Sequence, residues 1–318
     1  MTTPLVDEAI RTASGWTFDA YAAGPREGEG VLMLHGYPQT RDTWREQIPA
    51  LAQAGYRVIA PNQRGYSAGA RPSASDLSQY HFDLLVRDAL EIAEAAGIGD
   101  RCFHLVGHDW GGQVAWGVAD RHPQRLASLT ILSRPHPLAF ASALQAPDGD
   151  QKHRSRHHRA FLDPKTARLL LEDNARRLRS GLVHGGVPET AVDRYLAVLA
   201  DPEALEAALA WYRASRDLRA DIGSIAVPTL YLWGDADATV GPAAAHGTGE
   251  QVAAAYRMEV LPGIGHFATD QIPDTINRLL LDHLAAHSAA HSAAHSAAHA
   301  EPRSAVPRPA PPGRAEPS

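Results

Sequence analysis

The stretch FHLVGHDWGG at residues 103–112 decides the fold of this chain. Its first residues form a mostly apolar run typical of a buried strand, and the residues after it, including Val114 and Val118, continue as a helical pattern. Glycines on both sides of one residue between a strand and a helix permit a sharp, strained turn that pushes its side chain out at the carboxyl edge of a sheet. The sequence therefore predicts that Asp109 is presented at this edge.

Strand-like and helical patterns alternate along most of the chain. A first helix is expected to begin with a capping box formed by Thr43 and Glu46, and a second pattern over residues 82–92 ends near Gly97, a residue suited to a left-handed helix cap. The alternation predicts an α/β fold with a mostly parallel sheet covered on both faces. The expected strands are Gly30 to Leu34, Tyr56 to Ala60, Phe103 to Val106, Leu129 to Leu132, Thr229 to Trp233 and Met258 to Leu261.

The alternation breaks between about Arg134 and Asp221, where helical segments such as 167–178 and 204–215 follow one another without a convincing strand. We interpret this region as an inserted helical cap. From residue 287 the chain consists of Ala-His-Ser repeats and a proline-rich end, a composition typical of a disordered tail. The predicted organisation is a core over residues 1–133 and 221–286, a cap over 134–220, and a low-complexity tail over 287–318.

Composition excludes several classes of protein. The net charge of −6 and the scattered arginines argue against a nucleic-acid partner. Cys102 is the only cysteine, so an intramolecular disulfide and a cysteine metal site are both excluded, and a reducing compartment is expected. No apolar run has the length of a signal-peptide core or of a membrane span. We therefore expect a cytoplasmic protein without a membrane association.

At the Asp109 turn the chain resembles the α/β-hydrolase superfamily, in particular its branch with aspartate at the nucleophile elbow, the epoxide hydrolases and haloalkane dehalogenases. The likeness covers roughly residues 12–286. It implies an α/β-hydrolase fold with a mostly parallel eight-stranded sheet flanked by helices, and a helical cap inserted into it. It also implies that no cofactor and no metal is required.

An aspartate at this turn is already anionic at neutral pH, so it needs no base before it attacks. Attack on an sp3 carbon gives a stable alkyl-enzyme ester, whereas attack on an amide or simple ester gives only a labile anhydride. The family order of nucleophile, acid and histidine then points to Asp237 and His266, each after a late strand, as the pair that drives water onto the ester. Asp235 is the less favoured acid.

The stretch Leu34-His35-Gly36-Tyr37-Pro38 resembles the superfamily's oxyanion-hole turn. Backbone N–H groups of Tyr37 and Trp110 are expected to hold the charge that develops on the Asp109 carbonyl oxygen. His35 and His108, which flank the site, are interpreted as hydrogen-bonded scaffold residues, and Arg64 as a structural brace.

Residues of the expected cap indicate whether the leaving group is an epoxide oxygen or a halide. An epoxide oxygen leaves as a strong base and needs an acid, whereas a halide needs only N–H donors. Tyr212 resembles the epoxide hydrolase cap tyrosine that protonates the ring oxygen, and His157 stands where many of these enzymes have a second tyrosine. A core-side aromatic for Tyr212 and a solvated basic helix face around His157 are the structural alternatives.

The sequence thus predicts an epoxide hydrolase acting on a small apolar electrophile. A haloalkane dehalogenase is the first alternative. Many haloalkane dehalogenases, however, have an asparagine as the second halide donor at the position where this chain has Tyr37. Fluoroacetate dehalogenases carry arginines beside the nucleophile, where this chain has Trp110 and Gln113, so an anionic haloacid is disfavoured. A non-catalytic ligand-binding protein with a hydrolase fold is the alternative of another class.

Overall fold

Eight strands form one sheet in the computed structural model, which describes residues 4–215 and 222–298. The strand order is β1-β2-β4-β3-β5-β6-β7-β8. The pairs β1–β2 and β2–β4 are antiparallel, and all neighbouring strands from β4 to β8 in this order are parallel. This confirms the predicted α/β-hydrolase fold with a mostly parallel eight-stranded sheet. The strands are β1 (Val6–Arg11), β2 (Thr17–Ala23), β3 (Gly30–Leu34), β4 (Arg57–Pro61), β5 (Phe103–His108), β6 (Leu126–Leu132), β7 (Thr229–Gly234) and β8 (Tyr256–Leu261).

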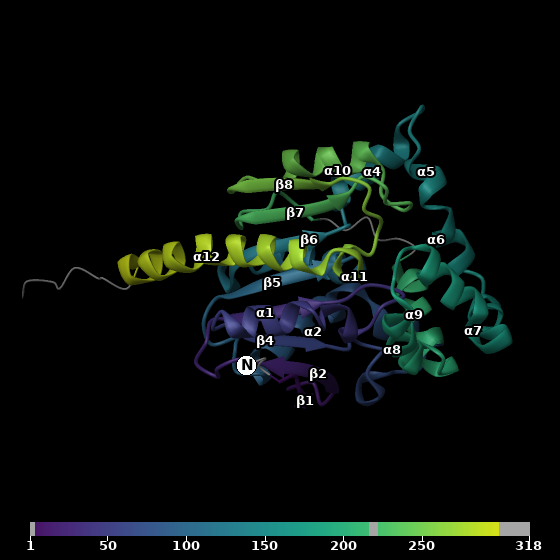
Figure 1. The fold of residues 1–318 in the computed structure, drawn as a ribbon, viewed down its shortest axis with the longest axis horizontal. Coiled ribbons are helices and arrows are strands. Elements are labelled where there is room, and N and C mark those ends of the chain that lie inside the picture. The colour runs from purple at the N-terminus through teal and green to yellow at the C-terminus, as the bar shows by residue number, and fades with distance from the viewer. Residues whose placement is uncertain (1–3, 216–221, 299–318) are drawn as a thin grey trace, which may run out of the picture.

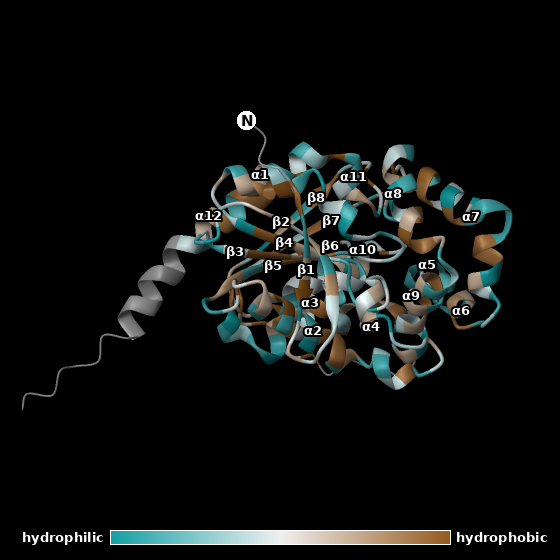
Figure 2. Ribbon diagram, turned by 90° about the horizontal axis from the view of Figure 1, so that it is seen from below, coloured by the Kyte–Doolittle hydropathy of each residue, from teal (hydrophilic) through white to brown (hydrophobic). Residues whose placement is uncertain are grey.

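Helices cover both faces of the sheet (Figure 1). The central strands β3 to β7 are almost entirely buried, as expected for strands with helices on both sides. Figure 2 shows their hydrophobic residues between the helix layers, with α1 and α12 on one side and α2 and α3 on the other. These helices are α1 (Gln47–Gln53), α2 (Phe82–Ala95), α3 (Trp110–Arg121) and α12 (Pro273–Ala298).

The start of the first helix differs from the prediction. Thr43 lies in a short 3-10 turn, Arg41–Trp44, that is capped by Thr40, and α1 begins only at Gln47 without a side-chain cap. The Thr43 hydroxyl is instead used in tertiary hydrogen bonds of 2.8 Å to Gln39 and Thr269. The predicted capping box was therefore wrong, because a tertiary network competes for the hydroxyl. The predicted end of α2 is confirmed by the positive φ of Gly97, 73°.

Six helices follow one another between β6 and β7, without an intervening strand in the described residues. The first packs against α10 (Pro242–Gly247) beside the sheet, whereas α6 to α9 lie beyond the strand ends, next to α11 (Ala268–Gln271) (Figure 1). The predicted cap ends at residue 220, which lies outside the described residues. The helices are α4 (Pro137–Gln145), α5 (Gln151–Arg154), α6 (Arg156–Phe161), α7 (Thr166–His184), α8 (Glu189–Leu199) and α9 (Pro202–Ala214).

The C-terminal helix α12 continues to Ala298 and so includes the beginning of the predicted tail. Residues 299–318 of that tail lie outside the described residues. None of the helices in the described parts of the chain combines the length and apolar character that a bilayer span requires.

One buried ion pair ties the turn after β4 to helix α2. Arg64 donates from Nε and Nη2 to the two carboxylate oxygens of Asp88, each at 2.6 Å, and both side chains are almost fully buried. The bidentate geometry satisfies both charges together. This confirms the predicted role of Arg64 as a structural brace.

Candidate active site

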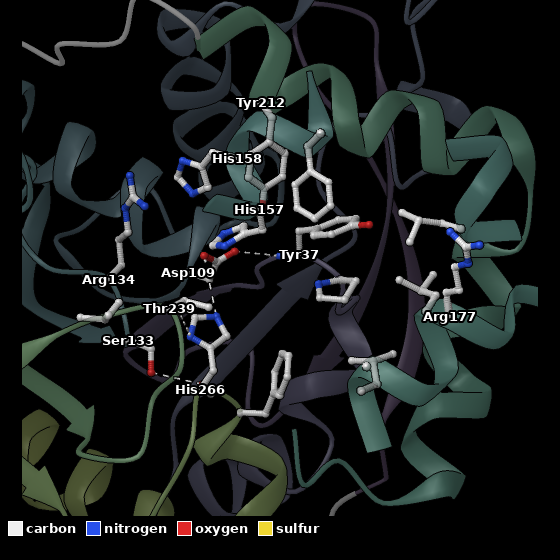
Figure 3. Close-up of a pocket in the computed structure, with 18 of the residues that line it drawn as sticks. Tyr37, Asp109, Ser133, Arg134, His157, His158, Arg177, Tyr212, Thr239 and His266 are labelled. Carbon is white, nitrogen blue, oxygen red and sulfur yellow. Dashed lines mark hydrogen bonds and ion pairs between the residues drawn. The ribbon is translucent and has the colours of Figure 1, made fainter. Parts of the chain in front are cut away.

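The turn between β5 and α3 carries Asp109 in a strained conformation, with φ 49° and ψ −116°. Such a positive φ is rare for a residue with a side chain and is kept only where the surroundings enforce it. Here the glycines permit close packing, because a Cβ on Gly111 would lie 2.1 Å from the carbonyl oxygen of Leu34, and one on Gly107 would lie 2.5 Å from that of Gly111. The tight turn therefore directs the carboxylate into a cavity (Figure 3).

The Asp109 carboxylate lies against the early turn that the sequence predicted as an oxyanion hole. The Tyr37 backbone N–H donates to Oδ1 of Asp109 at 3.0 Å. Burial alone would raise the pKa of Asp109, but the neighbouring charges of His266 and Arg134 and this hydrogen bond lower it below its usual value. The carboxylate is consequently ionised at neutral pH. Trp110, the other expected donor, is the first residue of α3.

His266 and Asp237, which lie in the turns after β8 and β7, form a direct hydrogen-bonded pair. The Nδ1 atom of His266 is 2.9 Å from Oδ2 of Asp237 and 3.0 Å from the Thr239 hydroxyl. The other oxygen of Asp237 accepts hydrogen bonds from the backbone N–H groups of Thr239 and Val240. Asp235 is exposed and accepts from the Gly263 N–H instead. The favoured acid is thus the one that contacts the imidazole.

The opposite edge of the same imidazole faces the nucleophile candidate, with His266 Nε2 3.8 Å from Oδ2 of Asp109. The carbonyl of His266 is anchored by the His108 ring at 2.9 Å and the Ser133 hydroxyl at 3.2 Å. Burial lowers the pKa of His266, but Asp237 and Asp109 outweigh this and raise it above its usual value. His108 is a scaffold residue, as predicted, and burial lowers its pKa to about 4.

Tyr212 of α9 is the central ring of an aromatic group above Asp109. Its ring centre lies 4.8 Å from Phe161, 5.0 Å from Trp110 and 5.6 Å from Tyr37. Burial and the charge of Asp109 raise the pKa of Tyr212 well above 10, against a hydrogen bond with Trp110 that lowers it. The phenol therefore stays protonated and lines the same cavity as the carboxylate. Tyr212 is also part of the hydrophobic core, so it combines the position of a buried core aromatic with a place in the cavity wall.

His157 of α6 also lines the cavity, so it does not lie on a solvated helix face. Its Nδ1 atom is 3.0 Å from the carbonyl oxygen of Arg154, and burial lowers its pKa. The adjacent His158 lines the cavity too, with a pKa lowered to about 3 by burial and by the neighbouring His157. Sequence reasoning did not single out His158, because consecutive helical residues usually face different directions.

The cavity has a volume of about 260 Å³, and its wall is largely apolar. Arg134, which follows β6, is a charged lining residue that sequence reasoning missed. In the described residues no group of three or more His, Cys, Asp or Glu side chains is placed to bind a metal ion. The apolar contributors are Phe140, Phe161, Leu170, Leu178, Leu182 and Phe267.

Comparisons with known proteins point to one family. The chain matches the family profile described as alpha/beta hydrolase fold over residues 30–271. Epoxide hydrolase 3 of Xenopus tropicalis is 30% identical over 85% of this chain and 75% of the relative. AB hydrolase superfamily protein YfhM of Bacillus subtilis is 32% identical over 85% of this chain and 95% of the relative. The solved Bacillus megaterium epoxide hydrolase in complex with an inhibitor has a TM-score of 0.77 and 26% identity, over 87% of this chain and 99% of that one.

Proposed function

This chain belongs to the alpha/beta hydrolase fold family, and we propose that it is an epoxide hydrolase, which adds water to an epoxide to give a vicinal diol. The observation that carries the proposal is the placement of the Tyr212 phenol and the Asp109 carboxylate in one largely apolar cavity. Two relatives in the comparisons are named epoxide hydrolases. In this proposal the helices that contribute His157 and Tyr212 act as a cap over the sheet.

In the first step Asp109 attacks one ring carbon of the epoxide. A bond forms between a carboxylate oxygen and that carbon, and the ring carbon–oxygen bond breaks, so that the negative charge moves to the ring oxygen. Tyr212 lines the same cavity as Asp109 and donates a proton to this oxygen, because an alkoxide is a strong base that needs an acid as it leaves. The product of the step is a neutral ester on Asp109 and a tyrosinate, whose proton is returned later.

We propose His157 as a second contact to the ring oxygen. Its Nδ1–H donates to the Arg154 carbonyl, so the remaining nitrogen, Nε2, carries a proton only in the imidazolium form. Since burial lowers the pKa of His157, the ring is mainly neutral at neutral pH. Tyr212 is therefore the principal acid, and His157 contributes most at low pH.

In the second step water hydrolyses the ester. His266 takes a proton from water as the oxygen attacks the Asp109 carbonyl carbon, and Asp237 holds the imidazole and stabilises its charged form. The N–H groups of Tyr37 and Trp110 stabilise the oxyanion, the former from its observed position beside Asp109. When the ester bond breaks, the departing alcohol oxygen takes the proton that His266 removed from water, and the second proton of that water passes from the Asp109 carboxyl group to the Tyr212 phenolate. The diol then leaves, and Asp109 is again a carboxylate, with one oxygen from water.

The cavity lining also bears on the dehalogenase alternative. Trp110, whose indole could hold a departing halide, is not among the described residues that line the cavity. The site thus has an acid suited to an oxygen leaving group and lacks the paired N–H donors of a halide site among the described cavity residues. The hydrogen bond between His266 and Asp237 and the 3.8 Å approach of His266 Nε2 to Asp109 support an enzyme over a purely ligand-binding role.

The proposal is tested with purified enzyme, styrene oxide and 1-bromobutane. The wild-type protein is expected to form the diol and to release little bromide, and both Asp109→Asn and Tyr212→Phe are expected to lose diol formation. A single turnover in heavy-oxygen water should place the isotope in Asp109. Undiminished diol formation in both variants, or bromide release that exceeds diol formation, would overturn the proposal.

A further inference from the structure

Arg134 lines the cavity and influences the charge of Asp109, but no proton transfer or bond change in the proposed reaction is assigned to it. Its Nε and Nη2 atoms donate to Oε1 of Gln113 at 2.9 and 2.7 Å, and its guanidinium carbon lies 5.7 Å from the Trp110 ring centre and 5.0 Å from that of Phe140. These contacts fix the group. The Nη1 atom makes no hydrogen bond to any described residue and remains accessible to solvent. One edge of a rigid five-donor fork is therefore available to a ligand.

No carboxylate of the described residues lies within 4.0 Å of this guanidinium. Arg64 shows the contrasting arrangement, because Asp88 neutralises it through two hydrogen bonds of 2.6 Å. A half-buried cation whose close acceptor is a neutral amide is unfavourable unless something else compensates it. Asp109 contributes at longer range, and its charge disappears when it becomes an ester. Once the ester has formed, the positive charge of Arg134 is therefore no longer balanced by Asp109.

We propose that Arg134 binds a carboxylate on the substrate, so that the preferred substrates are epoxides with an apolar body and an anionic group close to the ring. This inference rests on the proposed function and specifies its substrate class. The accessible edge of the guanidinium matches the two oxygens of a carboxylate, which can accept two parallel hydrogen bonds. The apolar wall of the cavity accommodates the rest of the molecule.

The position of Arg134 supports a subsite near the reacting atoms. Figure 3 shows Arg134 and Arg177 at opposite ends of the cavity, with Asp109 between them. The charge of Arg134 acts on Asp109, His157 and His266, and lowers the pKa of the Asp109 carboxyl. Arg177 is exposed on α7 and provides a matched cation at the other end of the same cavity.

The test compares two epoxides of nearly equal shape, trans-3-phenylglycidate and trans-β-methylstyrene oxide, in which a methyl group replaces the carboxylate. Loss of a charge-assisted bidentate contact corresponds to about 10-fold to 100-fold in affinity. Arg134→Gln is therefore expected to lower the ratio of kcat/KM for the anion to kcat/KM for the neutral epoxide by that factor, mainly through KM. Arg134→Lys should restore part of the ratio, and Arg177→Gln should leave it within about twofold.

An unchanged ratio in Arg134→Gln would overturn the inference, as would an equal loss for both epoxides, since the arginine would then act on Asp109 or on the leaving oxygen. If the wild-type protein hydrolysed neither epoxide, the proposed function would fail, and calorimetry would still decide the role of Arg134. In that measurement 3-phenylpropanoate should bind the wild-type protein more tightly than 3-phenylpropanol does, and Arg134→Gln should abolish the difference. Equal binding of the two compounds would refute the subsite.

Discussion

The imidazole of His266 holds its Nδ1 atom 2.9 Å from Oδ2 of Asp237, a carboxylate with no solvent exposure. This contact fixes the tautomer in which Nδ1 carries the proton and Nε2 is free to accept one. Because Nε2 faces Asp109, the base is directed at the position where a water would attack the ester.

Replacing His266 with Gln should separate the two proposed steps. The ester on Asp109 would still form, but its hydrolysis would lose a general base. Such a base typically accelerates a reaction by about 10²-fold to 10⁴-fold. Intact-protein mass spectrometry after incubation with styrene oxide should show an adduct of one substrate mass, and peptide mapping should locate it at Asp109. The double variant with Asp109→Asn is the control and should show no adduct.

The pH dependence of turnover should report the charge of His266. The neutral imidazole is the active form, so kcat should fall as pH decreases through the pKa of His266, which lies above 6.5. Asp237→Asn removes the main influence that raises this pKa, so the acid limb of the kcat profile should move to lower pH while kcat itself drops. A limb that stays in place in this variant would contradict the assignment. Tyr212 should add no basic limb below about pH 10.

Tyr195 of α8 should stabilise the fold through its contacts with Asp270 of α11. Its hydroxyl donates to the carboxylate at 2.8 Å, and Gln39 donates to it at 2.7 Å, while burial raises the Asp270 pKa to about 6. Tyr195→Phe should lower the free energy of unfolding at pH 7 by about 1–3 kcal/mol, since it removes a donor from a buried charged group. Urea denaturation measures this change.

The matched control is Tyr231→Phe. Tyr231 is also fully buried, but its hydroxyl has no hydrogen-bond partner among the described residues. Removing an unsatisfied buried hydroxyl should leave the stability unchanged or slightly increase it. Equal destabilisation by the two substitutions would show that packing, and not the contact with Asp270, explains the loss.

Gly36→Ala should impair the nucleophile. A Cβ at this position would lie 2.6 Å from Oδ1 of Asp109, so the carboxylate must move from the Tyr37 N–H. We expect kcat/KM for styrene oxide to fall by about 10²-fold, the effect typical of misplacing a reacting group. Gly181→Ala in helix α7 is the control, because nothing lies within 4 Å of a Cβ at this position. Thermal unfolding of this variant should show a free energy of unfolding higher by about 0.5–1 kcal/mol.

The sequence was informative where function depends on local patterns. Asp109 follows a buried strand and precedes a helix, so its presentation at the sheet edge could be predicted from ten residues. Asp237 and His266 could be proposed because each comes after a predicted strand and because they follow the order of nucleophile, acid and histidine that the resemblance to the family implies. Strands β1 and β2 were not predicted. In β1 only Ile10 of the six residues is buried, so its hydrophobic alternation is weak.

Contacts between distant segments could not be predicted in the same way. Arg134, the second residue after β6, meets Gln113 of α3 because β6 pairs with β5. This contact follows from the sheet order and not from local sequence. Tyr195 and Asp270 are 75 positions apart and meet only when α8 packs near the turn after β8. The failed capping box shares this cause in part, since Thr269, 226 positions away, uses the Thr43 hydroxyl.

Asp109 and Ser133 follow the neighbouring strands β5 and β6, and both have a positive φ, of 49° and 51°. The native state thus retains conformational energy at the residue that carries the carboxylate and at the residue whose hydroxyl holds the His266 carbonyl. Selection for thermal tolerance alone would favour glycine or asparagine there. The sequence that resists heat best and the sequence that turns over substrate fastest are consequently different sequences of this protein.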